Sequence, residues 1–445
     1  MAKQYFGTDG IRGRANEGLL TAQNVMRIAS ATGRYISALP GGATKVIIGT
    51  DTRQSASMFE AALIAGFTSQ GINVSLLGVV PTPAVAMMTR SLGATLGVMV
   101  TASHNPFYDN GIKFFGANGR KLSDEAELAI EALIDGDDEP YAGNIGMASR
   151  DDESPKIYAQ RVQKTLPEGV SLSGLKVVLD CANGAAYQSA PEIFRGLGIK
   201  DLTIIANAPD GSNINKQCGS THTQHLSKTV VSCGADIGIA LDGDADRLIV
   251  CDETGHMVDG DQLLGLLGAA WQKAGTLRGG GIVATVMSNL GLERYLESIG
   301  LKLERTDVGD RYVAERMRVA DFNIGGEQSG HLLLTDYAAT GDGTMAAIQV
   351  LAEVVTQGRP ASEVLSVFTA LPQKLTNVRY EGESPLGKSA VQAAIAVANI
   401  KMAGSGRILV RASGTEPLIR VMAEGDDSAL VDTVTAELAV IIGKN

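Results

Sequence analysis

The stretch ATLGVMVTASHNP, residues 94–106, is an apolar, strand-like run that ends in a polar loop. Two further stretches have the same form: ADIGIALDGDADR, residues 235–247, and ADFNIGGEQSGH, residues 320–331. Short apolar runs closed by turn residues are typical of strands buried in a parallel sheet. The three stretches therefore predict three strands that each carry a polar loop at the carboxyl end.

Each of these stretches closes a block that begins with another strand-like run. The block openings are KVIIGTDTR from Lys45, LKVVLDCANG from Leu175 and GGIVATVMSN from Gly280. A helical stretch and a second strand follow each opening, in NVSLLGVV, LTIIANA and LKLERTDV. This alternation predicts three similar α/β domains with mixed, largely parallel sheets. Because ligand groups gather at the carboxyl ends of such strands, we expect the three polar loops to face one central cleft.

The end of the chain has a different pattern. An alanine-rich helical stretch, SAVQAAIAVANI, precedes the strand–turn–strand pattern GRILVRASGTEPLIRVMAEG and a final helix. This order predicts a smaller C-terminal α+β domain. The expected domains are 1–152, 153–255, 256–369 and 370–445.

Composition limits the function classes. The 445 residues are 44% hydrophobic and carry a formal charge of -11, which argues against a general nucleic-acid or membrane-surface role. No run approaches the ~20 apolar residues of a membrane span, and the N-terminus lacks an apolar signal core. Without a C-x-x-C pair or zinc spacing, the four cysteines are expected to be reduced core thiols of a cytoplasmic protein.

The motif LDGDADR places Asp242, Asp244 and Asp246 at alternate positions of one loop. Three such close carboxylates repel one another unless a cation lies among them, and hard oxygen ligands select Mg²⁺, Ca²⁺ or Mn²⁺. An EF-hand is rejected, because Arg247 stands where that loop needs glycine and the flanks resemble strands. Arg247 beside the carboxylates suits a site that holds both a cation and a phosphate. A solvated acidic turn is the alternative.

Three other loops carry candidate binding residues. RASGTEPLIR suits an anion, because hydroxyls, backbone N–H groups and arginines meet in one turn, although a plain hairpin turn remains open. GGEQSGH places a carboxylate beside a hydroxyl, which suits a sugar. FGTDGIRGR brings Thr8, Arg12 and Arg14 into a glycine-rich loop, which is either a phosphate clamp or a surface loop.

Ser103 and His104 are adjacent, but a catalytic triad has little support. The chain has no G-x-S-x-G elbow, and along a strand His104 would face away from Ser103. A serine near three metal-binding carboxylates fits phosphoryl transfer better, because its oxygen can carry the phosphoryl group.

TASHNPFYDNGIK, DGDADR, GEQSGH and RASGTEP, in this order, resemble the α-D-phosphohexomutase family over essentially the whole chain. YFGTDGIRG and Gln328 are similar to the bacterial branch that acts on glucosamine phosphates. The resemblance implies reversible conversion of glucosamine 6-phosphate to glucosamine 1-phosphate through a 1,6-bisphosphate, a step toward amino-sugar nucleotides and cell-wall precursors. A glucose- or mannose-directed mutase, a non-catalytic sugar-phosphate sensor and a metal-dependent phosphatase remain alternatives.

The resemblance also implies roles for single residues. Ser103 would be a phosphoserine that shares one Mg²⁺ with Asp242, Asp244 and Asp246. Lys113 would be a proton shuttle or charge stabiliser, and Arg12 an electrostatic stabiliser, since guanidinium stays protonated. Arg247 and His104 would complete the catalytic group, His104 either orienting Ser103 or simply packing.

Binding residues carry over in the same way. The sugar would be held by Glu327, Ser329, Gly309 and Asp310, and the non-reacting phosphate by Arg411, Ser413, Gly414, Thr415 and Arg420. Some relatives have histidine where this chain has Asp310, which leaves the acid–base assignment open. Glucosamine or glucose 1,6-bisphosphate would act as activator, the partner would be a phosphorylated amino sugar, and a homodimer is left open.

Overall fold

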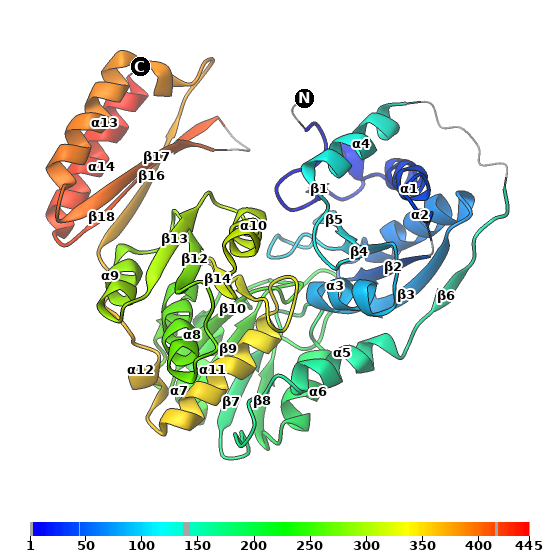
Figure 1. The fold of residues 1–445 in the computed structure, drawn as a ribbon, viewed down its shortest axis with the longest axis horizontal. Helices are drawn as coiled ribbons and strands as arrows, with labels where there is room; N and C mark the ends of the chain where they lie inside the picture. The colour runs from blue at the N-terminus through cyan, green and yellow to red at the C-terminus, as the bar shows by residue number, and fades with distance from the viewer. Residues whose placement is uncertain (1–2, 44, 137–142, 414–416, 445) are drawn as a thin grey trace.

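The computed structural model describes residues 3–43, 45–136, 143–413 and 417–444. Its strands form four sheets, of six, five, four and three strands in chain order. Figure 1 shows them along the chain from blue to red, with the red and orange C-terminal sheet set apart from the other three. No helix in the described ranges has both the length and the apolar character needed to cross a membrane.

The first domain is built on a six-stranded sheet in the order β1-β5-β4-β2-β3-β6. Its central strand β2 is parallel to both neighbours, β3 and β4, whereas β5 returns antiparallel to β4. The strands are β1 (Ile11–Arg14), β2 (Lys45–Thr50), β3 (Asn73–Val79), β4 (Leu96–Val100), β5 (Asp109–Gly116) and β6 (Ala148–Arg150). The helices are α1 (Ala22–Ser37), α2 (Ala56–Ser69), α3 (Thr82–Ser91) and α4 (Asp124–Asp135), with a short 3-10 turn at Gly18–Leu20.

The second domain repeats this plan in a five-stranded sheet of order β11-β10-β9-β7-β8. Its strands are β7 (Lys176–Asp180), β8 (Asp201–Ile205), β9 (Ile237–Leu241), β10 (Leu248–Asp252) and β11 (Met257–Val258). Its helices are α5 (Ser154–Gln163), α6 (Ser189–Gly196) and α7 (Gln224–Cys233). Strands β9 and β10 flank the LDGDADR loop, so the flanks are strands as expected and not the helices of an EF-hand.

The third domain has a four-stranded sheet of order β13-β12-β14-β15. Its strands are β12 (Gly281–Thr285), β13 (Lys302–Thr306), β14 (Ile324–Gly326) and β15 (Leu332–Leu334). Its helices are α8 (Gly260–Ala274), α9 (Leu290–Ser298), α10 (Asp310–Ala320), α11 (Gly343–Gln357) and α12 (Ala361–Val364).

The three domains share one topology, which confirms the predicted fold class. Each contains a unit of four strands that begins with the central strand β2, β7 or β12; the second and third strands of the unit lie parallel on its two sides, and the fourth returns antiparallel to the third. The three polar loops join the third strand to the fourth, at β4–β5, β9–β10 and β14–β15. The same topology therefore brings each loop to the carboxyl edge of its sheet.

The C-terminal domain has an antiparallel sheet of order β16-β18-β17, with two helices on one face (Figure 1). Its elements are β16 (Gln373–Arg379), a 3-10 turn at Pro385–Gly387, α13 (Ser389–Met402), β17 (Gly406–Ala412), β18 (Leu418–Gly425) and α14 (Ser428–Gly443). The hairpin β17–β18 and both helices match the prediction. The sequence analysis did not predict β16.

Apolar burial explains which domains hold together. One continuous core joins side chains of the first three domains, from Ile47 through Leu179 to Leu365. The C-terminal domain packs around a separate core that includes Val421 and Leu438. Fully burying an aliphatic side chain stabilises a fold by about 1.5–3 kcal/mol, so a shared core holds the first three domains together. The C-terminal domain lacks that restraint within the described residues.

The four cysteines are free thiols. Cys181, Cys218 and Cys251 are buried, as expected for core residues. Cys233 ends α7 at a partly exposed position, so its placement in the core was wrong.

Candidate active site

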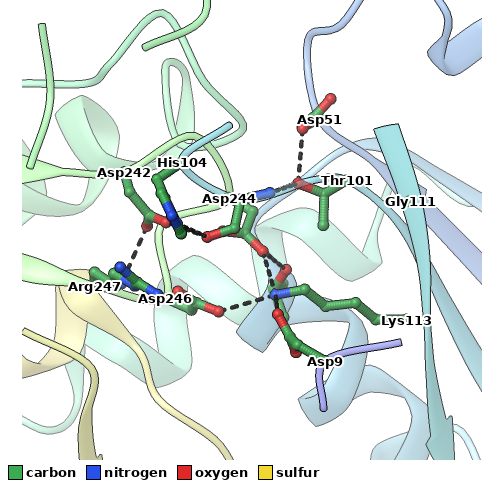
Figure 2. Close-up of polar contacts among 12 residues, drawn as sticks. Asp9, Asp51, Thr101, His104, Gly111, Lys113, Asp242, Asp244, Asp246 and Arg247 are labelled. Atoms are coloured by element: carbon green, nitrogen blue, oxygen red, sulfur yellow. Dashed lines mark hydrogen bonds and ion pairs between the residues drawn. The ribbon is translucent and has the colours of Figure 1, made fainter. Parts of the chain in front are cut away.

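The β4–β5 and β9–β10 loops meet face to face, as Figure 2 shows for His104 and the three aspartates. The Ser103 Oγ donates a 2.6 Å hydrogen bond to Asp242 Oδ2, although the two residues lie in different domains. Gly243 makes this approach possible, because a Cβ there would lie 2.5 Å from the Ser103 carbonyl oxygen. The candidate phosphoryl carrier and the candidate metal ligands therefore occupy one site.

Ser103 adopts a left-handed backbone conformation with φ of 51°, which costs an L-residue roughly 1–2 kcal/mol. The loop compensates through its backbone groups. Ser103 N–H donates to Thr101 Oγ1, which in turn donates to Asp51 Oδ2. The Ser103 carbonyl accepts from Arg53 at 2.8 Å and from Asn215 at 2.9 Å. These contacts fix the direction in which the hydroxyl points.

His104 does not face away from Ser103, contrary to the sequence expectation. Its Nδ1 lies 3.4 Å from Ser103 Oγ, because the segment turns at Ser103 and no longer alternates as a strand does. Burial, together with the positive charges of Arg247 and Arg12, lowers the His104 pKa to about 4. The ring is therefore neutral near pH 7 and is available as a hydrogen-bonding neighbour of the serine.

The three aspartates present carboxylate oxygens that all lie within 4.8 Å of one another. Asp244 Oδ1 and Asp246 Oδ1 are buried and have no hydrogen-bond partner among the described residues. Buried carboxylate oxygens are costly unless something pairs with them. A cluster of hard, unsatisfied oxygens of this kind fits a divalent cation such as Mg²⁺.

The electrostatics of this cluster are uneven. Burial raises the pKa of Asp242 well above its usual range, and the charges of Asp246 and Asp244 raise it further. Burial also opposes the charge on Asp246, but Lys113, followed by His331, holds its pKa well below the usual range. Cationic neighbours thus keep part of the cluster ionised in a buried place.

Lys113, from β5, is the cation that joins the aspartate loop to Asp9 near the N-terminus (Figure 2). Its Nζ lies 2.8 Å from Asp244 Oδ2 and 3.1 Å from both Asp246 Oδ2 and Asp9 Oδ2. Burial lowers its pKa, but the three carboxylates outweigh this effect and raise the pKa well above its usual value. This setting keeps Lys113 protonated, which favours charge stabilisation over proton shuttling.

A closed ring of alternating charges surrounds the cluster. Lys121 pairs with Asp9 and, at 2.7 Å, with Asp310 Oδ2. His331 lies 3.5 Å from Asp310 through Nε2 and 3.5 Å from Asp246 through Nδ1. Since Lys113 contacts both Asp246 and Asp9, the ring closes and ties together three domains. Asp310 therefore lies beside the metal loop as well as beside the sugar loop.

Arg12 pairs with Asp9 and so lies next to this ring. It lies on strand β1 rather than in the expected glycine-rich loop, because residues 11–14 pair with β5. Arg14, two positions further on, pairs with Glu17 at 2.9 Å and lies over the Tyr108 ring. Arg14 thus contributes to the surface near β1 and not to the site.

The candidate sugar loop brings Gly309, Glu327 and Ser329 together. Glu327 Oε1 accepts from Gly309 N–H at 3.0 Å, and Oε2 accepts from the Ser329 hydroxyl at 3.1 Å. Gly309 has φ of 134°, a conformation that L side chains rarely adopt. Burial lowers the pKa of Arg247, but the three aspartates and Glu327 outweigh this effect and raise that pKa above its usual value. Arg247 thus lies between the metal loop and the sugar loop.

Arg411 and Arg420 are direct cross-strand partners on β17 and β18. Burial and the neighbouring Arg420 lower the Arg411 pKa, and Asp307 of the third domain opposes this shift. Like charges directly opposite on a sheet destabilise it, and the buried Nε atoms of both arginines lack partners among the described residues. This pair fits an anion. Gly414 and Thr415 lie outside the described residues, and Ser413 N–H donates to the Leu418 carbonyl at 2.7 Å.

Several residues of this site were not among the sequence candidates. Arg53 and Asn215 hold the Ser103 loop, Thr82 donates to Asp244 Oδ2 at 2.6 Å, and Asp9 and Lys121 complete the ring. Arg53, Asn215 and Thr82 hold residues that lie 50 or more positions away in the chain, so no local spacing indicated them.

A serine beside a buried cluster of three aspartates, in a fold of three similar α/β domains, is the arrangement of a phosphoryl-transfer enzyme. Comparison with known proteins agrees with this class. Models of the phosphoglucomutase/phosphomannomutase family match as alpha/beta/alpha domain I at residues 3–141, domain II at 156–255, domain III at 259–371 and the C-terminal domain at 375–440. The chain belongs to this family.

Individual relatives narrow the comparison. A phosphoglucosamine mutase of Ruegeria sp. is 56% identical over 99% of both chains. The solved structure of a phosphoglucomutase/phosphomannomutase family protein from Burkholderia thailandensis aligns with a TM-score of 0.82 at 22% identity, covering 100% of this chain and 98% of that one. An N-acetylphosphoglucosamine mutase of Aspergillus fumigatus, in complex with GlcNAc-6P and magnesium, aligns with a TM-score of 0.69 at 20% identity, covering 100% and 96%. The last two likenesses concern the fold.

Proposed function

We propose that this protein is a phosphoglucosamine mutase that interconverts glucosamine 6-phosphate and glucosamine 1-phosphate, with Ser103 as the phosphoryl carrier. The observation that carries the proposal is the 2.6 Å contact between Ser103 Oγ and Asp242 within the three-aspartate cluster. The sugar is inferred from the name of the relative that is 56% identical over almost the whole chain.

Asp242, Asp244 and Asp246 would hold Mg²⁺ together with an oxygen of phosphorylated Ser103. The unsatisfied buried oxygens of Asp244 and Asp246 support this assignment. Bound Mg²⁺ neutralises charge on the phosphoryl group. Lys113, Arg12 and Arg247 add fixed positive charge on the surrounding sides.

The reaction consists of two transfers in opposite directions. In the first, the free sugar hydroxyl forms a bond to the phosphorus of phosphoserine 103, the phosphorus–Oγ bond breaks, and the hydroxyl proton is released. The product is glucosamine 1,6-bisphosphate, which then reverses its orientation within the site. In the second transfer, Ser103 Oγ takes the other phosphoryl group and the sugar oxygen regains a proton. Added 1,6-bisphosphate would activate the enzyme by phosphorylating Ser103.

The binding loops must accept both orientations of the intermediate. Glu327, Ser329, Gly309 and Asp310 would hold sugar hydroxyls through groups that two poses can share. Arg411 and Arg420, with Ser413, Gly414 and Thr415, would bind the phosphate that is not reacting. In this assignment the residue ranges 1–152, 153–255, 256–369 and 370–445 supply the phosphoserine, metal, sugar and phosphate sites, respectively. A homodimer is compatible with this arrangement.

Substrate profiling tests this function. The phosphorylated protein is assayed with the 6-phosphates of glucosamine, glucose and mannose, with Mg²⁺ and 1,6-bisphosphate present. We expect the highest kcat/KM for glucosamine 6-phosphate. A higher value for glucose or mannose would identify a different mutase, and net release of phosphate would identify a phosphatase. Absence of any phosphoryl exchange would indicate a non-catalytic sensor.

A further inference from the structure

A cavity of about 860 Å³ lies where the first three domains meet, apart from the candidate active site. Its walls are α3 and the turn at residues 118–120 from the first domain, α5 from the second, and residues 335–345 from the third. None of the candidate site residues described above lines it. Its volume is within the usual range for small-molecule sites.

Four cationic side chains line this cavity: Arg90, Arg120, Arg161 and Lys164. Within the described residues, none of them forms an ion pair with a carboxylate. The lining carboxylate, Asp336, already pairs with Arg278 at 2.8 Å and accepts from Asn323. All four side chains are exposed, and Arg161 also donates to the Ser91 hydroxyl, so their positive charges remain available to an anion bound in the cavity.

The same cavity offers an apolar surface beside these cations. Met87, Val162 and Tyr337 contribute to its lining. Tyr337 is 39% exposed, and its ring packs edge to face on Trp271 with centroids 5.8 Å apart. Phosphate groups suit the cations, and a planar ring suits the apolar wall. We propose that this cavity binds a nucleoside di- or triphosphate, a site that does not rest on the proposed function.

Two walls of the cavity also contact the metal loop. Helix α3 contributes Thr82, whose hydroxyl donates to Asp244 Oδ2 at 2.6 Å, and further along the same helix Met87 and Arg90 line the cavity. The segment from the third domain leads into Gly343, whose N–H donates to the Ala245 carbonyl at 2.9 Å. A ligand that contacts both walls is therefore coupled to the loop that carries the aspartates, and its binding changes turnover.

The chain contains one tryptophan, so Trp271 fluorescence reports on the cavity through Tyr337. Uridine diphosphate is titrated into the full-length protein, with inorganic pyrophosphate and uridine as partial probes. We expect a saturable fluorescence change with uridine diphosphate, weaker binding of both partial probes, and at least a twofold change in turnover at saturation. The double variant R90Q/R161Q should weaken binding at least tenfold.

Lys156→Gln is the matched control, because Lys156 is an exposed cation on the same helix as Arg161 that pairs with Glu153 and does not line the cavity. Melting temperatures establish that both variants are folded. The proposal is overturned if fluorescence and equilibrium dialysis detect no binding at millimolar nucleotide, or if R90Q/R161Q binds as tightly as Lys156→Gln. Pyrophosphate that binds as tightly as uridine diphosphate would contradict the nucleoside assignment. Unchanged turnover at saturation would contradict the coupling.

Discussion

The position of Ser103 depends on a buried arginine that makes no contact with its hydroxyl. Arg53 is fully buried, pairs with Asp51 at 2.8 Å and donates to the carbonyls of Ser103, Asn105 and Asp109. Several charge-assisted hydrogen bonds from one planar group restrict a loop more than a single contact does. The loop therefore presents Ser103 in a fixed orientation, which suits a residue proposed to carry a phosphoryl group.

Asp244 provides a test of the metal site. Asp244→Asn removes one charge from the three carboxylates but keeps an oxygen that accepts from Thr82. We expect turnover to fall at least ~100-fold, because one charged ligand of the cation is lost. The melting temperature should change little, since repulsion among the carboxylates also decreases. Steady-state rates and thermal melts are measured with and without Mg²⁺.

In this experiment, Mg²⁺ should raise the melting temperature of the wild type more than that of the variant, because a ligand that binds the folded state stabilises it. Equal losses of activity and stability, with no difference in the Mg²⁺ response, would instead indicate that Asp244 has a structural role.

At the level of single residues, the sequence indicated candidate site residues that lie close together in the chain. The aspartates of LDGDADR are recognisable because three of them share one loop, and Glu327 and Ser329 share another. Arg53, Asn215 and Lys121 could not be found in this way, because the residues they contact are distant in the chain and, for Asn215 and Lys121, lie in another domain. His104 was misplaced because no pattern revealed that Ser103 turns the backbone.

At the level of elements, the repeated topology explains why three loops of unrelated sequence meet. Each loop follows the third strand of its four-strand unit, which lies next to the central strand. This arrangement was predictable because the buried strands are strongly apolar. Strands β1 and β16 were missed for the opposite reason: IRGR and QKLTNVR lack a continuous apolar pattern and lie at sheet edges.

Asp261, in the first turn of helix α8, should make the free energy of unfolding depend on pH. Burial, followed by the charge of Asp259, raises the pKa of Asp261 to about 7 against the opposing hydrogen bond from Asn289 N–H. The folded state thus binds a proton that the unfolded state releases near pH 4. The ionised carboxylate therefore destabilises the fold progressively as pH rises from about 4 to 7.

Asp261→Asn cannot ionise and can still accept from Asn289. We expect this variant to melt above the wild type at pH 8, with an advantage that shrinks as pH falls toward 4. Trp271 lies on the same helix and reports the unfolding locally. Asp152→Asn, at an exposed carboxylate, is the control and should show no such trend. An advantage that is constant with pH, or that grows toward pH 4, would contradict the expected ionisation.

At the level of the whole molecule, the C-terminal domain is attached by polar contacts rather than by the shared core. Arg407 on β17 donates to the carbonyls of Val286 at 2.9 Å and Ser288 at 2.8 Å in the third domain, and pairs with buried Glu424. Gln373 Nε2 also donates to Glu424 and to the Met287 carbonyl. Such an attachment can set the orientation of the domain while allowing it to move.

Removing this attachment should weaken substrate binding more than it slows chemistry. The double variant Arg407→Gln/Glu424→Gln leaves no unpaired buried charge, but it loses the hydrogen bonds from Arg407 to carbonyls of the third domain. We expect KM for glucosamine 6-phosphate to rise about tenfold, because the clamp of Arg411 and Arg420 is less well positioned, with a smaller change in kcat. Steady-state kinetics measure both constants.

Arg294→Gln is the control for this prediction. Arg294 also joins the third domain to the fourth, through an exposed pair with Asp426, and exposed pairs contribute only about 0–1 kcal/mol. KM should therefore change little in this variant. A fall in kcat without a rise in KM in the double variant would argue against a positioning role for Arg407.

Phosphoryl transfer to Ser103 is the central claim, and it can be measured directly. The protein is incubated with Mg²⁺ and glucose 1,6-bisphosphate labelled with ³²P, and the labelled peptide is then identified. The account predicts label on Ser103, and in Ser103→Ala no label on that peptide and turnover reduced at least ~1,000-fold in a folded protein. Near-normal turnover by Ser103→Ala, or stoichiometric label on another residue, would contradict it.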